Sequence, residues 1–232
     1  MAGFTFMNST AEPALAHKAS MENIYRLQRH IYDVTRRYYL LGRDQMLNQL
    51  DVPQNGSVLE IGCGTGRNIV RVAQRFPTAR LFGLDISEEM LKSATAAIGR
   101  HGLRGRVVFA NADATNFQPE LCFGQAKFDR IFFSYTLSMV PDWQGALQHA
   151  LKFLALDGEL HIVDFGQCAS LPKSFKHSLS TWLKIFHVYP RSELKTKLEE
   201  LSRANGLNLE FCKLYRDYAW LFVSKKKQLL SC

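Results

Sequence analysis

A short apolar stretch followed at once by three alternating glycines is the feature that most constrains how this chain folds. Residues 58–61 have the composition of a buried strand, and Gly62, Gly64 and Gly66 follow them. Because glycine has no side chain, backbone N–H groups in such a loop can close around an anionic or zwitterionic ligand. A dinucleotide fingerprint would place its third glycine at position 67, which is arginine, so the spacing is E-x-G-x-G-x-G, starting at Glu60. The loop predicts a nucleotide-type pocket after a strand of an α/β sheet.

An acidic residue supports this interpretation. Asp85 lies nineteen positions after Gly66 and ends a second apolar stretch, residues 81–85, where an acid is suited to bind ribose hydroxyls. The glycine loop and this acid together resemble those of class I S-adenosylmethionine-dependent methyltransferases. The resemblance implies a Rossmann-like fold, with S-adenosylmethionine as cofactor and S-adenosylhomocysteine as product.

The order of the remaining segments agrees with such a fold. Strand-like stretches at residues 106–110, 128–134 and 160–165 alternate with helical ones, and residues 207–215 and 218–225 predict a terminal hairpin. We therefore expect an α/β protein with a doubly wound, seven-stranded, mostly parallel sheet and a reversed last strand. The expected organisation is an N-terminal helical extension over residues 1–50 and a methyltransferase domain over residues 51–232.

Net charge and cysteine content indicate which partners and which cellular compartment to expect. The formal net charge of +8 favours nucleic acid or an anionic membrane surface as partner. Five cysteines without metal-ligand spacing indicate neither a disulfide framework nor a zinc site, so we expect no metal and a reducing, cytoplasmic location. The N-terminus does not have the pattern of a signal peptide, and no stretch reaches the roughly 20 apolar residues of a spanning helix. Any membrane contact would then be peripheral.

Residues 21–50 predict a helix of about five turns, interrupted at Gly42. Its apolar side chains alternate steps of three and four, which places them on one helical face. Tyrosines recur every seventh position beside that face; they flank either a substrate or simply a face packed on the core. The apolar positions are Ile24, Leu27, Ile31, Val34, Tyr38 and Leu41, and the tyrosines are Tyr25, Tyr32 and Tyr39.

Residues 171–188 form a second amphipathic segment. Large apolar side chains, among them Phe175 and Trp182, have helical spacing, and Lys173, Lys176 and Lys184 give the other side a basic character. A helix of this kind can lie in the headgroup region of an anionic membrane. The alternative is a helix that caps the core with its lysines in water.

The choice of substrate rests on two longer stretches. The sequence after residues 128–134 lacks the Pro-Pro motif of enzymes that methylate planar nitrogens, which argues against a nucleic-acid partner. Residues 25–44 and 135–143 closely resemble bacterial betaine-lipid methyltransferases. That resemblance implies trimethylation of the amine of diacylglycerylhomoserine to diacylglyceryl-trimethylhomoserine by an enzyme peripherally bound to the inner face of the cell membrane. The synthase that makes this lipid is a further expected partner. The rival interpretations are methylation of phosphatidylethanolamine or a soluble amine, and a non-catalytic cofactor-binding module.

Three tyrosines are the predicted catalytic residues: Tyr32 first, then Tyr25 and Tyr135. A neutral amine must attack the methyl group, so a nearby tyrosine can accept its proton, and aromatic faces stabilise the methylated cation. For Tyr135 the alternative is a core aromatic at the end of a strand.

The predicted cofactor-binding residues follow the order of the strands. We expect the methionine end to contact the glycine loop and Ser134, the ribose to contact an acid, and the adenine to lie between apolar side chains. Arg43 could pair with the methionine carboxylate, the alternative being a surface arginine on a loop. The full set is Glu60, Gly62, Gly64, Gly66, Asp85, Ile86, Met90, Asp113, Ala114, Ser134 and Arg43.

Overall fold

A seven-stranded sheet organises the computed structural model, which describes residues 39–226. The strand order is β3-β2-β1-β4-β5-β7-β6. The pairs among β1 to β5 are parallel, whereas β7 runs antiparallel to both β5 and β6. This confirms the doubly wound, mostly parallel sheet with a reversed last strand. The strands are β1 (Ser57–Ile61), β2 (Arg80–Asp85), β3 (Val107–Asn111), β4 (Phe128–Ser134), β5 (Leu154–Phe165), β6 (Leu207–Leu214) and β7 (Ala219–Lys226).

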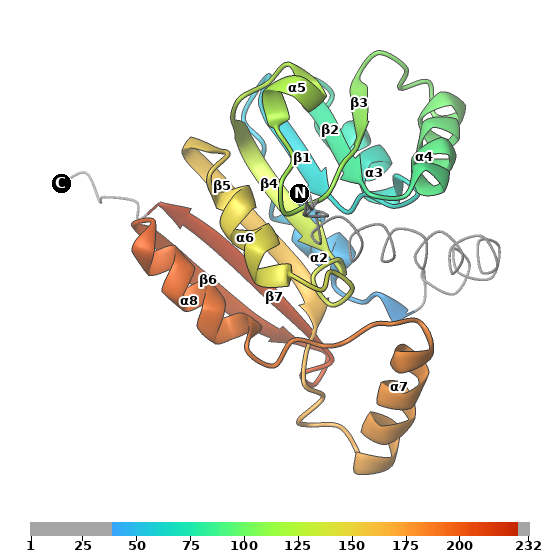
Figure 1. The fold of residues 1–232 in the computed structure, drawn as a ribbon, viewed down its shortest axis with the longest axis vertical. Coiled ribbons are helices and arrows are strands. Elements are labelled where there is room, and N and C mark those ends of the chain that lie inside the picture. The colour runs from blue at the N-terminus through green and yellow to red at the C-terminus, as the bar shows by residue number, and fades with distance from the viewer. Residues whose placement is uncertain (1–38, 227–232) are drawn as a thin grey trace, which may run out of the picture.

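Helices cover both faces of the sheet and create two cores (Figure 1). Strand β1 shows how: Val58 packs into one core, while Leu59 and Ile61 pack into the other, as the alternation of a strand requires. One core includes α2 (Arg43–Asn48), α3 (Arg67–Arg75) and α4 (Glu88–Arg100). The other includes α5 (Pro119–Phe123), α6 (Trp143–Leu151) and α8 (Leu194–Ala204).

Local sequence signals explain several helix ends. A serine before two acids is a typical helix start, and Ser87 caps α4, its hydroxyl accepting a hydrogen bond from the Met90 N–H at 3.3 Å. The sequence pattern at residues 143–158 predicts a helix to Leu154 closed by a turn at Asp157 and Gly158, and this prediction was wrong. Helix α6 ends at Leu151, and both residues lie in the long strand β5, where its register with β4 shifts. A β-bulge has turn-like residues without ending the strand, which is why the sequence suggested a turn.

The described part of the predicted extension joins the main core. Gly42 has a φ of 83°, which is not a helical value, so it breaks the predicted helix as expected and directly precedes α2. Met46, Leu47 and Leu50 are buried in the core that also contains Val58 of β1. The rest of the predicted helix, residues 21–38, lies outside the described residues.

Helix α7 (Lys173–Ile185) connects β5 to α8 and stands at one end of the molecule, apart from the helices that cover the sheet (Figure 1). Leu183 is its one buried residue. Within residues 39–226, no helix is both long and apolar enough to cross a membrane.

Candidate functional site

The glycine loop leaves β1 with a backbone that other residues would strain. Gly62, Gly64 and Gly66 have φ values of 75°, 54° and 77°, in the left-handed region that favours glycine. At Gly62 space is also lacking, because an added Cβ would lie 2.3 Å from the Thr136 side chain. The turn after β1 therefore depends on glycine for both its conformation and its close approach to the β4 loop.

Asp85 holds this loop in place. One carboxylate oxygen accepts a hydrogen bond from the Gly64 N–H at 2.7 Å, and the other accepts one from the Ser87 N–H at 2.9 Å. The carboxylate is nearly buried at the end of β2. A carboxylate can accept more than two hydrogen bonds, so these contacts are compatible with a predicted contact to ribose hydroxyls. That ribose contact stays a prediction.

A pocket of 220 Å³ opens beside the loop. Glu60 on β1 and Arg43 at the start of α2 both line it although they are only 1% and 7% exposed. Asn68 Nδ2 donates to Glu60 Oε1 at 2.7 Å and fixes that carboxylate. Arg43 Nε donates to the Leu40 carbonyl at 3.1 Å, so Arg43 is a buried helix residue and the alternative of a surface arginine on a loop was wrong.

The lining of this pocket suits a zwitterion such as the methionine end of S-adenosylmethionine. A carboxylate, a guanidinium and the backbone of the glycine loop lie around one small space, which allows an ammonium and a carboxylate to be bound together. Ser134 adds a second observation: it lines the pocket, and its Oγ is buried with no hydrogen-bond partner within the described part of the chain. Such an atom is expected to be satisfied by a ligand or by water.

The predicted adenine side lies at the same edge of the sheet, after β2 and β3. The Ile86 carbonyl accepts from Asn111 Nδ2 at 2.8 Å, and Met90 is buried against Met139 and Phe186. Asp113 closes its own turn by accepting from the Thr115 N–H and hydroxyl, both at 2.8 Å; Ala114, next in the chain, packs against the second core. The carboxyl ends of parallel strands thus bring these positions together, as the fold class predicts.

Tyr135 has a different environment. Its hydroxyl donates to the Leu41 carbonyl at 2.6 Å, its ring is 4.6 Å from that of Phe165, and it is 2% exposed. Burial is the main cause that raises the pKa of Tyr135 well above its usual value, so the phenol stays protonated at neutral pH. This environment is the one expected for a core aromatic at the end of a strand, which was the alternative interpretation of Tyr135. The catalytic role of Tyr135 stays a prediction. Tyr25 and Tyr32 lie outside the described residues.

Several residues of the site were not predicted from the sequence. Asn68 orients Glu60, and Thr136 packs under Gly62 while its hydroxyl donates to the Ile61 carbonyl at 3.1 Å. The position of Asn68, two residues after the last glycine of the loop, is the signal that could have identified it. Thr136 carries no such signal, since only the folded β4 loop brings it to Gly62.

A buried acid beside the β4 loop was also missed. Asp164, near the end of β5, accepts hydrogen bonds from the Ser138 N–H at 3.1 Å and the Phe165 N–H at 2.8 Å. Burial raises its pKa to about 6. In the glycine loop, burial and then the Asp85 and Glu60 carboxylates raise the pKa of the Cys63 thiol, which therefore stays protonated. Over residues 39–226, no cluster of three or more histidine, cysteine or acidic side chains is placed to bind a metal ion.

Comparison with known proteins identifies a family and several relatives. Residues 53–206 match the family model described as "Methyltransferase domain". Malonyl-[acyl-carrier protein] O-methyltransferase 1 of Ilyobacter polytropus is 25% identical over 83% of this chain and 68% of its own length. Trans-aconitate 2-methyltransferase of an Enterobacter species is 30% identical over 51% of this chain, which spans only 42% of that relative.

A solved structure shares the architecture. The 1,6-didemethyltoxoflavin-N1-methyltransferase of Burkholderia thailandensis, solved with 1,6-didemethyltoxoflavin and S-adenosylhomocysteine, superposes with a TM-score of 0.66. The match covers 97% of this chain and 94% of that chain at 18% sequence identity. At that identity the likeness shows the fold alone.

Proposed function

This chain belongs to the methyltransferase-domain family, and from that premise we propose that it is an S-adenosylmethionine-dependent N-methyltransferase acting on the amine of a lipid headgroup. Its proposed substrate is diacylglycerylhomoserine, which it converts to the betaine lipid diacylglyceryl-trimethylhomoserine. The lipid assignment comes from the resemblance of residues 25–44 and 135–143 to betaine-lipid methyltransferases.

Helix α7 is the structural observation that supports a lipid substrate. Phe175 and Ile185 are 45% and 62% exposed, although both are large and apolar. Lys173, Lys176 and Lys184 are exposed on the same helix. Exposed apolar side chains next to lysines are typical of a helix that lies at an anionic membrane surface. We propose that α7 docks the enzyme peripherally on the cytoplasmic face of the membrane.

Methyl transfer requires the protein mainly to position the amine and the cofactor, because the cofactor already contains its own leaving group. When bound, S-adenosylmethionine supplies a methyl group on a sulfonium centre, and its sulfur leaves as the thioether of S-adenosylhomocysteine. The amine nitrogen bonds to that carbon as the carbon–sulfur bond breaks, and the resulting ammonium loses a proton before the next transfer. Glu60 and Arg43 would hold the methionine end, and Tyr32 is the proposed acceptor of the amine proton. After the third transfer the product is a fixed cation, which aromatic side chains stabilise.

A headgroup assay tests this proposal. The purified full chain is incubated with S-adenosylmethionine and vesicles that contain diacylglycerylhomoserine, phosphatidylethanolamine or neither, and products are identified by mass spectrometry. We expect mono-, di- and trimethylated diacylglycerylhomoserine, and much lower turnover by Tyr32→Phe with unchanged cofactor affinity. Faster methylation of phosphatidylethanolamine or a soluble amine would refute the headgroup assignment. The names of the two relatives described above justify a further assay with carboxylate substrates. Formation of a methyl ester on malonyl-[acyl-carrier protein] or trans-aconitate, with no amine methylated, would favour an O-methyltransferase.

Docking is tested separately by sedimentation with anionic vesicles. Lys176→Glu combined with Lys184→Glu is expected to release the enzyme, because each lysine near an anionic surface contributes on the order of 1 kcal/mol. The matched control is Arg80→Glu with Lys127→Glu, which changes the net charge by the same amount. Both positions are exposed and lie at the N-terminal ends of β2 and β4, away from α7. Equal release of both variants would show that overall charge, not α7, controls binding.

A further inference from the structure

A second pocket, separate from the glycine loop, lies between α7 and the β6–β7 turn. Its volume is 580 Å³, within the range of small-molecule sites. All of its described lining residues are uncharged, and most are aromatic: Tyr39, Phe175, Trp182, Tyr215 and Tyr218. A pocket of this composition binds the apolar part of a ligand and has no charged side chain in its described lining to pair with a carboxylate.

The walls of this apolar pocket are held by packing and hydrogen bonds. The rings of Tyr39 and Trp182 meet edge to face with centroids 4.6 Å apart. Asp217 ties the β6–β7 turn to the loop that leads into α7, because its carboxylate accepts from the Ala169 N–H at 3.0 Å and from Trp220 Nε1 at 2.6 Å. The pocket is therefore formed before a ligand arrives, which lowers the entropic cost of binding.

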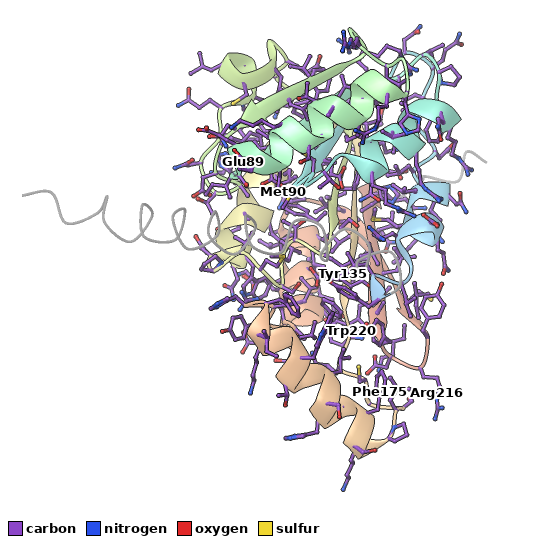
Figure 2. The ribbon with its side chains drawn as sticks, turned by 90° about the vertical axis from the view of Figure 1, so that its right-hand side faces the viewer. Glu89, Met90, Tyr135, Phe175, Arg216 and Trp220 are labelled. Carbon is purple, nitrogen blue, oxygen red and sulfur yellow. The ribbon has the colours of Figure 1, made fainter. Side chains whose placement is uncertain are left out.

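Exposed aromatic rings lie at the edge of this pocket, and exposed cations stand next to them in the chain. Phe175 and Tyr215 line the pocket yet are 45% and 52% exposed. Each is followed in the chain by an exposed cation, Lys176 and Arg216, and Figure 2 shows Phe175 and Arg216 at the same end of the molecule as α7. An apolar interior with a cationic rim complements an amphiphile that has an apolar chain and an anionic group at its head.

The apolar pocket also adjoins the cofactor-type pocket. Leu40 lines the pocket of the glycine loop, while its two neighbours, Tyr39 and Leu41, line the apolar one. Trp182 continues the connection: its ring lies 4.9 Å from that of Phe186, which packs with Met90 on the predicted adenine side. A ligand anchored in the apolar pocket would thus have its head next to the place of methyl transfer.

We infer that this apolar pocket holds one acyl chain of the membrane lipid whose headgroup is methylated. The inference rests on the proposed function, since it assigns a second part of the same substrate to a second pocket. Burying a chain here would remove the exposed faces of Phe175 and Tyr215 from water and leave the headgroup carboxylate near the cationic rim. It would also position the headgroup amine without requiring a charged contact inside the pocket.

Fluorescence quenching tests the inference independently of catalysis. The full chain is titrated with ω-bromoundecanoic acid below its micelle concentration, since bromine quenches a tryptophan that it contacts. Trp182 lines the pocket, whereas Trp143 and Trp220 are buried in the second core. We expect saturable quenching that disappears in Trp182→Phe. Competition by octanoic, decanoic and dodecanoic acids should strengthen by up to about fourfold per added methylene, the equivalent of about 0.8 kcal/mol.

Matched variants locate the site. Leu179→Asn places an amide in the lining and is expected to weaken binding at least tenfold, whereas Thr181→Asn on the exposed side of α7 should leave it unchanged. Phe175→Ser, at a half-exposed position, provides a second test if Leu179→Asn does not fold. Absence of quenching in the full chain, equal affinity in the lining and control variants, or affinity independent of chain length would each overturn the acyl-chain assignment.

The two proposals fail in different ways. Methylation of diacylglycerylhomoserine without bromo-acid quenching would refute the acyl site and leave the proposed function standing. Quenching of Trp182 with no methylation of that lipid would support the acyl site and refute the headgroup. A pocket that instead binds a small aromatic molecule and excludes alkyl chains would overturn the inference in favour of a soluble substrate.

Discussion

Asp85→Asn is the substitution that probes the candidate site most directly. In the structure both carboxylate oxygens already accept backbone hydrogen bonds, from Gly64 at 2.7 Å and from Ser87 at 2.9 Å. An asparagine offers one oxygen and one NH₂ group, so the NH₂ group must face one of these two N–H donors. The substitution keeps the shape of the side chain and removes its charge.

Its effect on cofactor binding follows from the strength of the lost interaction. A hydrogen bond to a charged group contributes about 1.5 to 3 kcal/mol. Loss of one such bond to a ribose hydroxyl would weaken binding about tenfold to hundredfold. The folded state also loses stability, by about 1 to 3 kcal/mol, because one nearly buried N–H of the loop or of the Ser87 turn has no acceptor.

Calorimetric titration with S-adenosylmethionine separates these two effects when it is combined with thermal unfolding. Asp129→Asn is the control for removing a carboxylate that accepts hydrogen bonds. Asp129 accepts from the Ser57 N–H and hydroxyl, both at 2.8 Å, at the N-terminal ends of β1 and β4, which is the edge of the sheet away from the candidate site. We expect Asp85→Asn to lose both stability and affinity. Asp129→Asn should keep its affinity and most of its stability, because both Ser57 groups donate to one oxygen, which an asparagine amide can supply. Wild-type affinity in folded Asp85→Asn would remove Asp85 from the ribose site.

Three further predictions follow from the geometry. Gly62→Ala should abolish cofactor binding and destabilise the fold, because the added Cβ would meet Thr136. Gly102→Ala, at a φ of 67° with open space around it, should cost only about 1 kcal/mol. Denaturant unfolding compares the stability of the two variants, and calorimetric titration compares their cofactor affinity. Asp164, with its pKa raised to about 6, binds more protons in the folded than in the unfolded state, so its contribution to stability should fall by up to about 3 kcal/mol as pH rises from about 4 to above 6; a constant stability difference from Asp164→Asn across that range would refute this. Tyr135→Phe should lose about 1 kcal/mol of stability, since its hydroxyl donates to the Leu41 carbonyl. A large loss of turnover in the stable variant would support the predicted catalytic role of Tyr135, and retained turnover would favour the core aromatic instead.

The sequence determined the sheet and the ligand edge because both depend on local patterns. Alternating and continuous apolar runs mark strands, Ser87 marks a helix start, and the glycines mark the turn that only glycine can adopt. Parallel strands then place their carboxyl ends at one edge, so Gly62, Asp85 and Ser134 could be assigned to a common site without coordinates.

Tertiary packing decided how those side chains are used. Asp85 supports the glycine loop in addition to its predicted ribose contact, and the Tyr135 hydroxyl donates to the Leu41 carbonyl across 94 positions of sequence. Neither partner is implied by local spacing, because each contact joins segments that meet only after the sheet has formed. Arg43 was ambiguous for the same reason: its burial depends on how α2 packs, which an arginine after a glycine does not reveal.

Helix α7 shows the same division. Its helical spacing and its lysines could be predicted from residues 171–188, and the structure gives a helix there. The apolar pocket beside it could not, because its aromatic lining comes from Tyr39, from α7 and from the β6–β7 turn, segments that are remote in the chain. A linear pattern determines which face of a helix is apolar, but only the packed chain determines whether that face is covered or borders a cavity.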